Sequence, residues 1–275
     1  MIKLRFLLAL TATVVAIHSA PAAAESIVLA STTSVESSGL LAKILPLFTA
    51  KTGITVNVVA QGTGKALDTA RRGDADLLLV HDPEAEAQFM GEGHGITRRQ
   101  IAWNDFVIVG PSADPAHVRG GHDSVAALKA IAAARAPFVS RGDNSGTHAA
   151  ELRLWKIAGL TPDMTTGEKW YRDIGGGMGQ ALNAASAMDA YTLSDRGTWL
   201  SFNNKGSLVI AVEGDPRLIN RYDVIELNPQ RHAGARLALA TIFADWLVSP
   251  EGQRAIGGYQ VNGEQLFNPS AAAPK

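Results

Sequence analysis

The amino-acid sequence predicts an α/β fold with two lobes, each a mostly parallel sheet flanked by helices. Apolar strands alternate with helical patterns between residues 27 and 80, which is the βαβ order of a doubly wound lobe. The unbroken apolar run at 77–80 suits a parallel strand that is buried on both faces. A further strand at 103–111 ends in Gly-Pro, where the chain can leave one lobe for the other. Ligands of such folds bind beyond the carboxyl ends of the strands.

The first residues have the pattern of an export signal. Lys3 and Arg5 precede an apolar stretch at 6–17, and small residues follow at 22–24. We expect residues 1–24 to be a signal peptide that is cleaved near Ala24, which leaves a periplasmic protein. Its removal takes away two basic residues and no acidic one, so the formal net charge changes from −1 to −3.

Composition excludes several classes of protein. The weakly acidic chain lacks the basic surface that nucleic acid selects, so we expect no nucleic-acid partner. The absence of cysteine excludes disulfides, thiolate metal sites and a lipid-anchored lipoprotein. We therefore expect no lipid anchor in the membrane. We also expect a monomer.

The first candidate site follows the strand at 27–30, which ends in four consecutive hydroxyl residues: Ser31, Thr32, Thr33 and Ser34. Apolar residues at helical spacing follow at 40–48, so the hydroxyls lie where a strand meets a helix N-terminus. Such a terminus has unpaired N–H groups and a partial positive charge, which attract anions. A helix cap needs only one hydroxyl, so four favour contact with a ligand.

A second strand-to-helix junction follows the strand at 54–59. Gly53 marks the end of the first helix, and residues 61–64 open the next helix with Thr63 among glycines. Thr63 either contacts the ligand or only caps its helix, and both interpretations stay open.

The most informative junction of the second half begins after a helix that we expect from residue 123 or 124 to residue 131 and a strand at 137–140. Arg141 precedes Ser145 and Thr147 at the start of a helix that Gly159 closes. Arginine offers an oxyanion a planar fork of donors, and the two hydroxyls with their amides complete a cup. The alternative is that Arg141 pairs with Asp143 on the surface.

The remaining elements complete the two lobes. Glycines at 175–179 begin a helix that extends over 180–188, and other elements are expected as a strand at 190–193, a turn at 194–197, strands at 208–212 and 222–227, and helices at 233–248 and 250–257. The strand at 222–227 can return the chain to the first lobe. We therefore assign residues 25–106 and 223–275 to lobe I and residues 107–222 to lobe II.

A family resemblance is visible in seven stretches taken in order: residues 31–34, 62–67, 73–81, 104–111, 141–147, 175–179 and 191–198. With them the chain resembles the periplasmic tungstate-binding proteins of ABC transporters, relatives of the molybdate-binding proteins with a type II periplasmic-binding fold. The resemblance implies a protein without enzymatic activity or cofactor that delivers an oxyanion to a membrane permease.

The resemblance also implies the ligand-binding residues. The matching positions are Thr32 and Ser34 in lobe I and Arg141 and Thr147 in lobe II. Thr33, Thr63 and Ser145 complete the predicted set, in which the tungsten is bound through its oxygens and not by metal ligation. The family commonly has threonine at position 31, so a contact from Ser31 stays open, as does one from Tyr191. We expect the lobes to close around a hinge near residues 104–110 and 221–227.

Ligand chemistry agrees with these donors. Tungstate and molybdate are fully deprotonated at neutral pH, so every oxygen accepts hydrogen bonds. Phosphate retains a proton and gains from a carboxylate such as Asp143, which we expect to cap its helix or to pair with Arg141. Sulfate also offers only acceptor oxygens, so its exclusion must rest on its smaller size. Molybdate, sulfate and phosphate therefore remain alternative ligands.

Two other functions compete with transport. A secreted hydrolase would use Ser34 or Ser145 as nucleophile and His81, His122 or His148 as base. Against this, the sequence has no Gly-x-Ser-x-Gly elbow, and Ser145 and His148 lie three residues apart at a helix start. A sensor lobe that signals to a partner without transport fits the export signal equally well.

Overall fold

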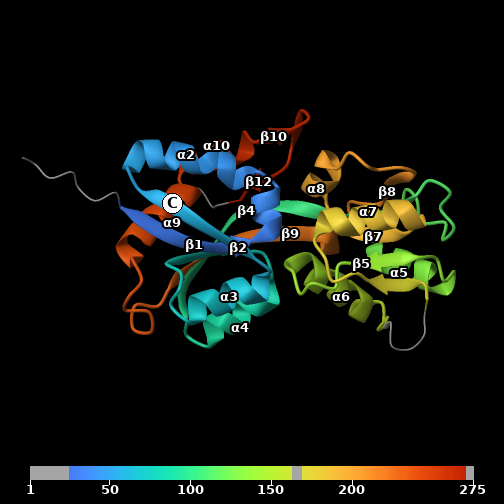
Figure 1. The fold of residues 1–275 in the computed structure, drawn as a ribbon, viewed down its shortest axis with the longest axis horizontal. Helices are drawn as coiled ribbons and strands as arrows, with labels where there is room; N and C mark the ends of the chain where they lie inside the picture. The colour runs from blue at the N-terminus through green and yellow to red at the C-terminus, as the bar shows by residue number, and fades with distance from the viewer. Residues whose placement is uncertain (1–24, 163–168, 271–275) are drawn as a thin grey trace, which may run out of the picture.

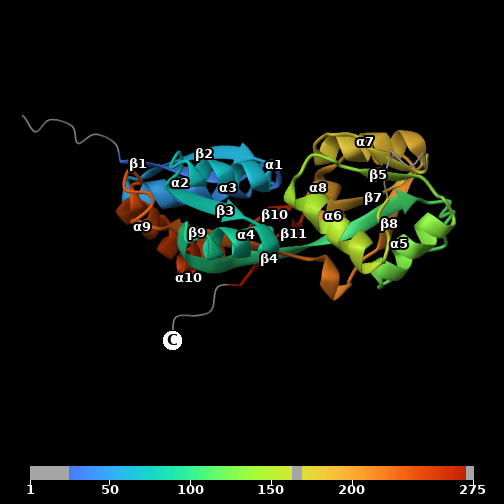
Figure 2. The same cartoon turned by 90° about the horizontal axis from the view of Figure 1, so that it is seen from below.

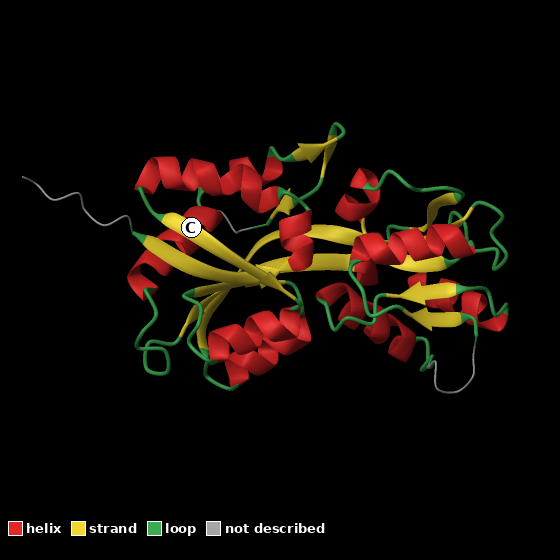
Figure 3. Cartoon of the chain, viewed as in Figure 1, coloured by secondary structure: helices red, strands yellow, loops and turns green. Residues whose placement is uncertain are grey.

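The computed structural model describes residues 25–162 and 169–270, and the predicted signal peptide lies outside them. The chain forms an α/β fold around a long mixed sheet with helices on both faces (Figure 1, Figure 3). The main strand order is β2-β1-β3-β9-β4-β7-β5-β6, and β8 and β12 also pair with β4. The strands are β1 (Ser26–Thr32), β2 (Thr55–Gln61), β3 (Leu77–Val80), β4 (Gly95–Pro111), β5 (Phe138–Ser140), β6 (Tyr171–Asp173), β7 (Tyr191–Asp195), β8 (Leu208–Val212), β9 (Ile219–Leu227), β10 (Gln260–Val261), β11 (Glu264–Gln265) and β12 (Asn268–Pro269). The helices are α1 (Thr33–Ser37), α2 (Leu40–Thr52), α3 (Thr63–Arg71), α4 (Pro83–Gly91), α5 (Ser124–Ala133), α6 (Gly146–Ile157), α7 (Met178–Met188), α8 (Arg196–Ser201), α9 (Leu237–Val248) and α10 (Pro250–Gly257), with a 3₁₀ turn, η2 (Pro216–Leu218).

Strand β4 joins two halves of the sheet. Its residues up to Asp105 pair antiparallel with β9, and from Phe106 onward they pair antiparallel with β7 and β8. The first half of the sheet comprises β2, β1, β3, β9 and residues 95–105 of β4. The second half comprises residues 106–111 of β4 with β5, β6, β7 and β8. Within the first half β1 is parallel to β2 and β3, and within the second half β5 is parallel to β6 and β7. Strand β9 is antiparallel to β3 and β4, and β4 is antiparallel to β7 and β8, so each half is mixed and not mostly parallel as predicted. Figure 2 shows β4 extending from one half into the other.

Each half of the sheet is covered by helices on both faces, as the alternation of strands and helices predicts. In the first half, one hydrophobic cluster contains residues of α2, α9 and α10, and another contains residues of α3 and α4. Consecutive β3 residues alternate between these clusters, since Leu77 and Leu79 belong to one and Leu78 and Val80 to the other. The apolar run at 77–80 is therefore buried on both faces, as the sequence predicts. In the second half, α5 and α6 contribute to one cluster and α7 and α8 to another.

Several elements differ from the sequence prediction, which lacks α4, β6 and β10 to β12 and begins the helix α9 at residue 233 rather than at Leu237. Three other differences have a clear physical reason. The first helix is divided into α1 and α2 by Gly39, which has a φ of 79°. The predicted turn at 194–197 is instead the end of β7 and the start of α8, because the Asp195 side chain accepts from the Thr198 N–H at 2.8 Å and caps a helix there. Strand β4 begins at Gly95 rather than near Trp103. The sequence does not predict its first residues as a strand, because they are mostly polar and carry little of the apolar pattern that marks one.

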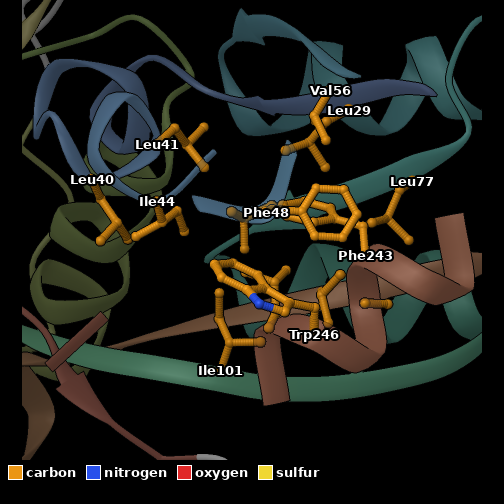
Figure 4. Close-up of a cluster of buried hydrophobic side chains, with 14 of the residues drawn as sticks. Leu29, Leu40, Leu41, Ile44, Phe48, Val56, Leu77, Ile101, Phe243 and Trp246 are labelled. Atoms are coloured by element: carbon orange, nitrogen blue, oxygen red, sulfur yellow. The ribbon is translucent and has the colours of Figure 1, made fainter. Parts of the chain in front are cut away.

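Phe48 is expected to contribute more to stability than its neighbour Leu47. The Phe48 ring is fully buried and packs 4.7 Å from the Phe243 ring and 5.5 Å from the Trp246 ring (Figure 4), whereas Leu47 is 47% exposed, contrary to its predicted place on the apolar face. We expect Phe48→Ala to lower the free energy of unfolding by about 3–5 kcal/mol, because it removes these contacts and leaves a cavity. Leu47→Ala is the matched control, with an expected change of about 0.5 kcal/mol or less. Urea unfolding of both variants measures the difference, and equal losses would contradict this assignment of the core.

Candidate functional site

The end of β1 presents two of its four hydroxyl groups together. Thr32 caps α1, where its Oγ1 accepts from the Val35 N–H at 3.3 Å, and it lies 3.2 Å from the Ser34 Oγ. Both side chains are buried. The other two hydroxyls are placed elsewhere, since Ser31 donates to the Leu79 carbonyl at 2.9 Å within the sheet and Thr33 is exposed on α1. The strand end therefore contributes Thr32 and Ser34 as a pair.

Ser34 continues into a buried chain of hydrogen bonds that connects several strands. Its Oγ lies 2.8 Å from His81 Nε2, and His81 Nδ1 lies 3.0 Å from Asn220 Oδ1 on β9. Asn220 Nδ2 donates to Asn104 Oδ1 at 2.9 Å and to the Tyr222 hydroxyl at 2.7 Å. Burial lowers the pKa of His81 to about 4, although the hydrogen bond to Asn220 opposes this shift. The imidazole is therefore neutral at neutral pH.

Thr63 lies at the start of α3, as the second junction predicts. Gly62 caps this helix without a side chain, so capping does not occupy the Thr63 hydroxyl. Thr63 is buried, and its Oγ1 has no hydrogen-bond partner among the described residues. An unpartnered buried hydroxyl is costly, which favours a ligand contact over the capping alternative.

Arg141 follows β5 and is surrounded by protein. Its side chain is 3% exposed, Nη2 donates to an Asp143 carboxylate oxygen, and Nη1 donates to Thr147 Oγ1 at 3.4 Å. Its Nε has no hydrogen-bond partner in the described part of the chain. Asp143 also accepts from the Ser145 N–H at 3.2 Å, and Arg141 together with the Ser145 hydrogen bonds holds the pKa of Asp143 below its usual range, against the effect of burial. Asp143 thus pairs with Arg141, as expected, but not on the surface.

Ser145 and Thr147 lie at the start of α6. The Ser145 Oγ accepts from the His148 N–H at 3.2 Å and caps the helix, while His148 Nδ1 accepts from the Asn144 N–H at 3.1 Å. The ring of His148 therefore bonds to a backbone amide and not to the Ser145 hydroxyl. Thr147 is buried beside Arg141.

The two halves touch at these loops. A Cβ on Gly146 would lie only 2.5 Å from Cε1 of His81, and a Cβ on Gly62 would lie 3.5 Å from the Asn144 carbonyl oxygen. An ion pair of 2.9 Å also joins Arg153 on α6 to Asp82 at the start of α4. The junctions after β1, β2, β3 and β5 thus converge, although they are far apart in the sequence.

The converging groups are chiefly hydrogen-bond donors. The Thr147 hydroxyl lies beside the Arg141 guanidinium, and Asp143 is already bonded to that guanidinium. The hydroxyls of Thr32 and Ser34 reach the same junction through His81, which approaches Gly146, and Thr63 follows Gly62, which approaches Asn144. Such a set suits an anion whose oxygens only accept. Over residues 25–162 and 169–270, no group of three or more His, Asp or Glu side chains could hold a metal ion. None of the helices in that part of the chain combines the length and the hydrophobicity that a membrane span requires.

Sequence reasoning did not place His81 or Gly146 in the site. His81 appears there at the end of the stretch 73–81 and as a candidate base of a hydrolase, but not among the ligand-binding residues, yet it directly follows β3, at the same sheet edge as Thr32 and Thr63. That position after a buried parallel strand is the signal that could have found it. The close approach of Gly146 to His81 depends on how the halves meet, which no local pattern reports.

The sequence is similar to a known protein family and to characterised relatives. Residues 18–251 match the family described as the PBP superfamily domain. The chain is 45% identical to the tungstate-binding protein TupA of Peptoclostridium acidaminophilum over 251 residues, which cover 90% of this chain and 86% of the relative.

Two solved structures have the same fold. The tungstate-binding protein TupA from Desulfovibrio alaskensis is 44% identical with a TM-score of 0.79, and the match covers 90% of this chain and 100% of that one. The tungstate ABC transporter protein from Geobacter sulfurreducens is 41% identical with a TM-score of 0.76, over 86% and 99% of the two chains. The chain therefore belongs to the PBP superfamily and, within it, to the family of the tungstate-binding proteins of ABC transporters.

Proposed function

We propose that the protein captures tungstate outside the cytoplasm and delivers it to the membrane permease of an ABC transporter. The observation that carries this proposal is the convergence of buried donors from both halves of the sheet, with the Thr63 hydroxyl and the Arg141 Nε lacking other partners in the described chain. Relatives more than 40% identical are named for tungstate. In a dry site each of these donor and charge contacts is strengthened.

In this proposal the oxyanion is bound from lobe I by Thr32, Ser34 and Thr63. From lobe II it is bound by Arg141, Ser145 and Thr147. Thr33 is exposed and contributes at most its backbone N–H, at the first position of α1. The lobes comprise residues 25–106 with 223–275, and residues 107–222. They close about β4 and β9, since β4 changes partners between Asp105 and Phe106. An exported monomer that closes over its ligand can present to the permease a surface that the unliganded protein does not form.

Molybdate is the closest competitor, because it has the same charge and only acceptor oxygens. Phosphate is disfavoured since Asp143, which could accept its proton, is engaged by Arg141 and the Ser145 N–H. The Ser34–His81 contact has the arrangement of a nucleophile and a base, but the family consists of binding proteins and this chain is not an enzyme. The hydrogen bond between Ser34 and His81 therefore positions the Ser34 hydroxyl in the binding site.

Isothermal titration with tungstate, molybdate, sulfate and phosphate tests this function. We expect tungstate and molybdate to bind with 1:1 stoichiometry, and sulfate to bind at least about tenfold more weakly, because a smaller ion leaves long hydrogen bonds that contribute less. Equal affinity for sulfate would contradict the assignment to tungstate. Binding of phosphate alone would assign the protein to another class of transporter.

A further inference from the structure

The direction of the Ser34–His81–Asn220 chain limits what Ser34 can offer a ligand. Asn220 Nδ2 already donates to Asn104 Oδ1 and to the Tyr222 hydroxyl, so its Oδ1 faces His81 as an acceptor. His81 Nδ1 must then carry the hydrogen, and a neutral imidazole leaves Nε2 bare. The Ser34 hydroxyl consequently donates to Nε2, and its own hydrogen is turned away from the site.

An oxyanion such as tungstate needs the opposite arrangement. All its oxygens accept, so Ser34 contacts it favourably only by donating. Two lone-pair oxygens brought together without a hydrogen would repel each other. Ser34 can turn its hydrogen to the ligand only if His81 Nε2 acquires a hydrogen of its own and donates to the Ser34 Oγ.

We propose that His81 takes up one proton from solvent when the oxyanion binds, so that Nε2–H donates to Ser34 and the Ser34 hydroxyl donates to the ligand. This inference depends on the proposed function, because it assigns a positioning role within the same site. Nδ1 retains its hydrogen bond to Asn220 throughout, and the strand contacts of the chain do not change.

The charges around His81 leave a bound oxyanion without a compensating positive charge. Asp82 directly follows His81 and forms an ion pair with Arg153 from α6. The Arg141 guanidinium forms an ion pair with the Asp143 carboxylate. The Tyr222 ring on β9 lies 5.0 Å from the His81 ring. The two nearby guanidiniums are therefore each neutralised by a carboxylate, and a bound dianion is left without net positive charge. A proton on His81 supplies that charge within the enclosed site.

Before binding, the same surroundings keep the imidazole neutral. Burial is the largest cause that lowers the pKa of His81 to about 4, and Arg141 and Arg153 lower it further, whereas Asn220 and Asp82 raise it. A dianion one hydroxyl away raises the pKa of this group, because it favours the charged form. Proton uptake then occurs at every pH between the free and bound values, and affinity rises as the pH falls.

Isothermal titration of wild type with tungstate, in buffers of different ionisation enthalpy, measures the uptake. Near pH 6 we expect uptake of as much as one proton per tungstate, and between about pH 8 and pH 6 the affinity should rise as the pH falls, by at most about tenfold for each unit. His81→Gln should bind with a nearly constant affinity over this range, because it keeps an amide N–H but cannot take up a proton. His122→Gln, an exposed histidine of the second half, should behave as wild type.

The outcomes separate this inference from the function. Wild-type protein that binds tungstate with no proton uptake would overturn the inference and leave the function intact, whereas absence of tungstate binding at every pH would contradict the function itself. Uptake that persists in His81→Gln but disappears in His148→Gln would also overturn it, because the proton would then reside on the buried histidine of α6. Should His81→Gln fail to fold, ¹⁵N NMR of histidine-labelled wild type decides, since the inference requires both His81 nitrogens to carry hydrogen in the complex.

Discussion

Arg141→Ala is expected to weaken tungstate binding on the order of a hundredfold or more. Truncating one partner of a buried, hydrogen-bonded charge pair costs about 2–5 kcal/mol, and each 1.4 kcal/mol corresponds to a tenfold change in affinity. Here the loss is compounded, because Asp143 would lose its guanidinium partner and would then face the dianion as an unpaired negative charge. Isothermal titration measures the affinity.

Two further variants locate the cause of that loss. Arg141→Lys keeps the positive charge but lacks the planar fork that bonds to both Thr147 and Asp143, so we expect an intermediate loss. Arg172→Ala removes an exposed arginine from β6 in the same half and should leave affinity unchanged. If Arg141→Ala bound tungstate as tightly as wild type, the anion would have to lie away from this guanidinium.

Gly146→Ala is expected to weaken binding by about 5- to 150-fold while the protein stays folded. An added Cβ would lie 2.5 Å from Cε1 and 2.8 Å from Nδ1 of His81, so the contact between α6 and the end of β3 could form only with displacement. Overpacking of this kind costs about 1–3 kcal/mol. The contact lies between the halves and outside their hydrophobic clusters, and alanine is a better helix former than glycine, so we expect little change in the midpoint of thermal unfolding.

The matched control is Gly179→Ala in the first turn of α7. A Cβ at Gly179 meets nothing within 4 Å, so this variant makes the same chemical change at a helix start of the same half without touching the other half. Titration with tungstate and thermal unfolding should distinguish the two variants. Equal affinities would mean that the approach of Gly146 to His81 is not needed for binding.

Local patterns in the sequence were sufficient to predict much of the fold. Burial on both faces of β3 follows from four consecutive apolar residues, and the helix ends at Gly53 and at residues 257–258 follow from glycine, as predicted. The start of α5 follows from Asp123, whose side chain accepts from the N–H groups of the next helical residues. These features depend on residues within one or two turns of each other, which is the range over which sequence patterns report structure.

The boundaries that were missed depend on distant partners. The first part of β4 is polar and becomes a strand because it pairs with β9, more than a hundred residues later. Leu47 on α2 is exposed, because the rotation of this helix is set by the face that it buries, with Leu41, Ile44 and Phe48. Propensity and periodicity are overridden in both places by tertiary contacts.

For the candidate site, the sequence by itself determined the chemistry: hydroxyl-rich strand ends, one arginine and an adjacent carboxylate that pairs with it. Only the tertiary structure decided which hydroxyls can serve, since Ser31 is used within the sheet and Thr33 is exposed while Thr32 and Ser34 are buried together. It also brought His81 between Ser34 and Asn220 and set Gly146 against its ring. The physical reason is that residue type fixes what a side chain can donate, accept or neutralise, whereas its direction and partners are fixed by strand register and by contacts between segments far apart in the chain.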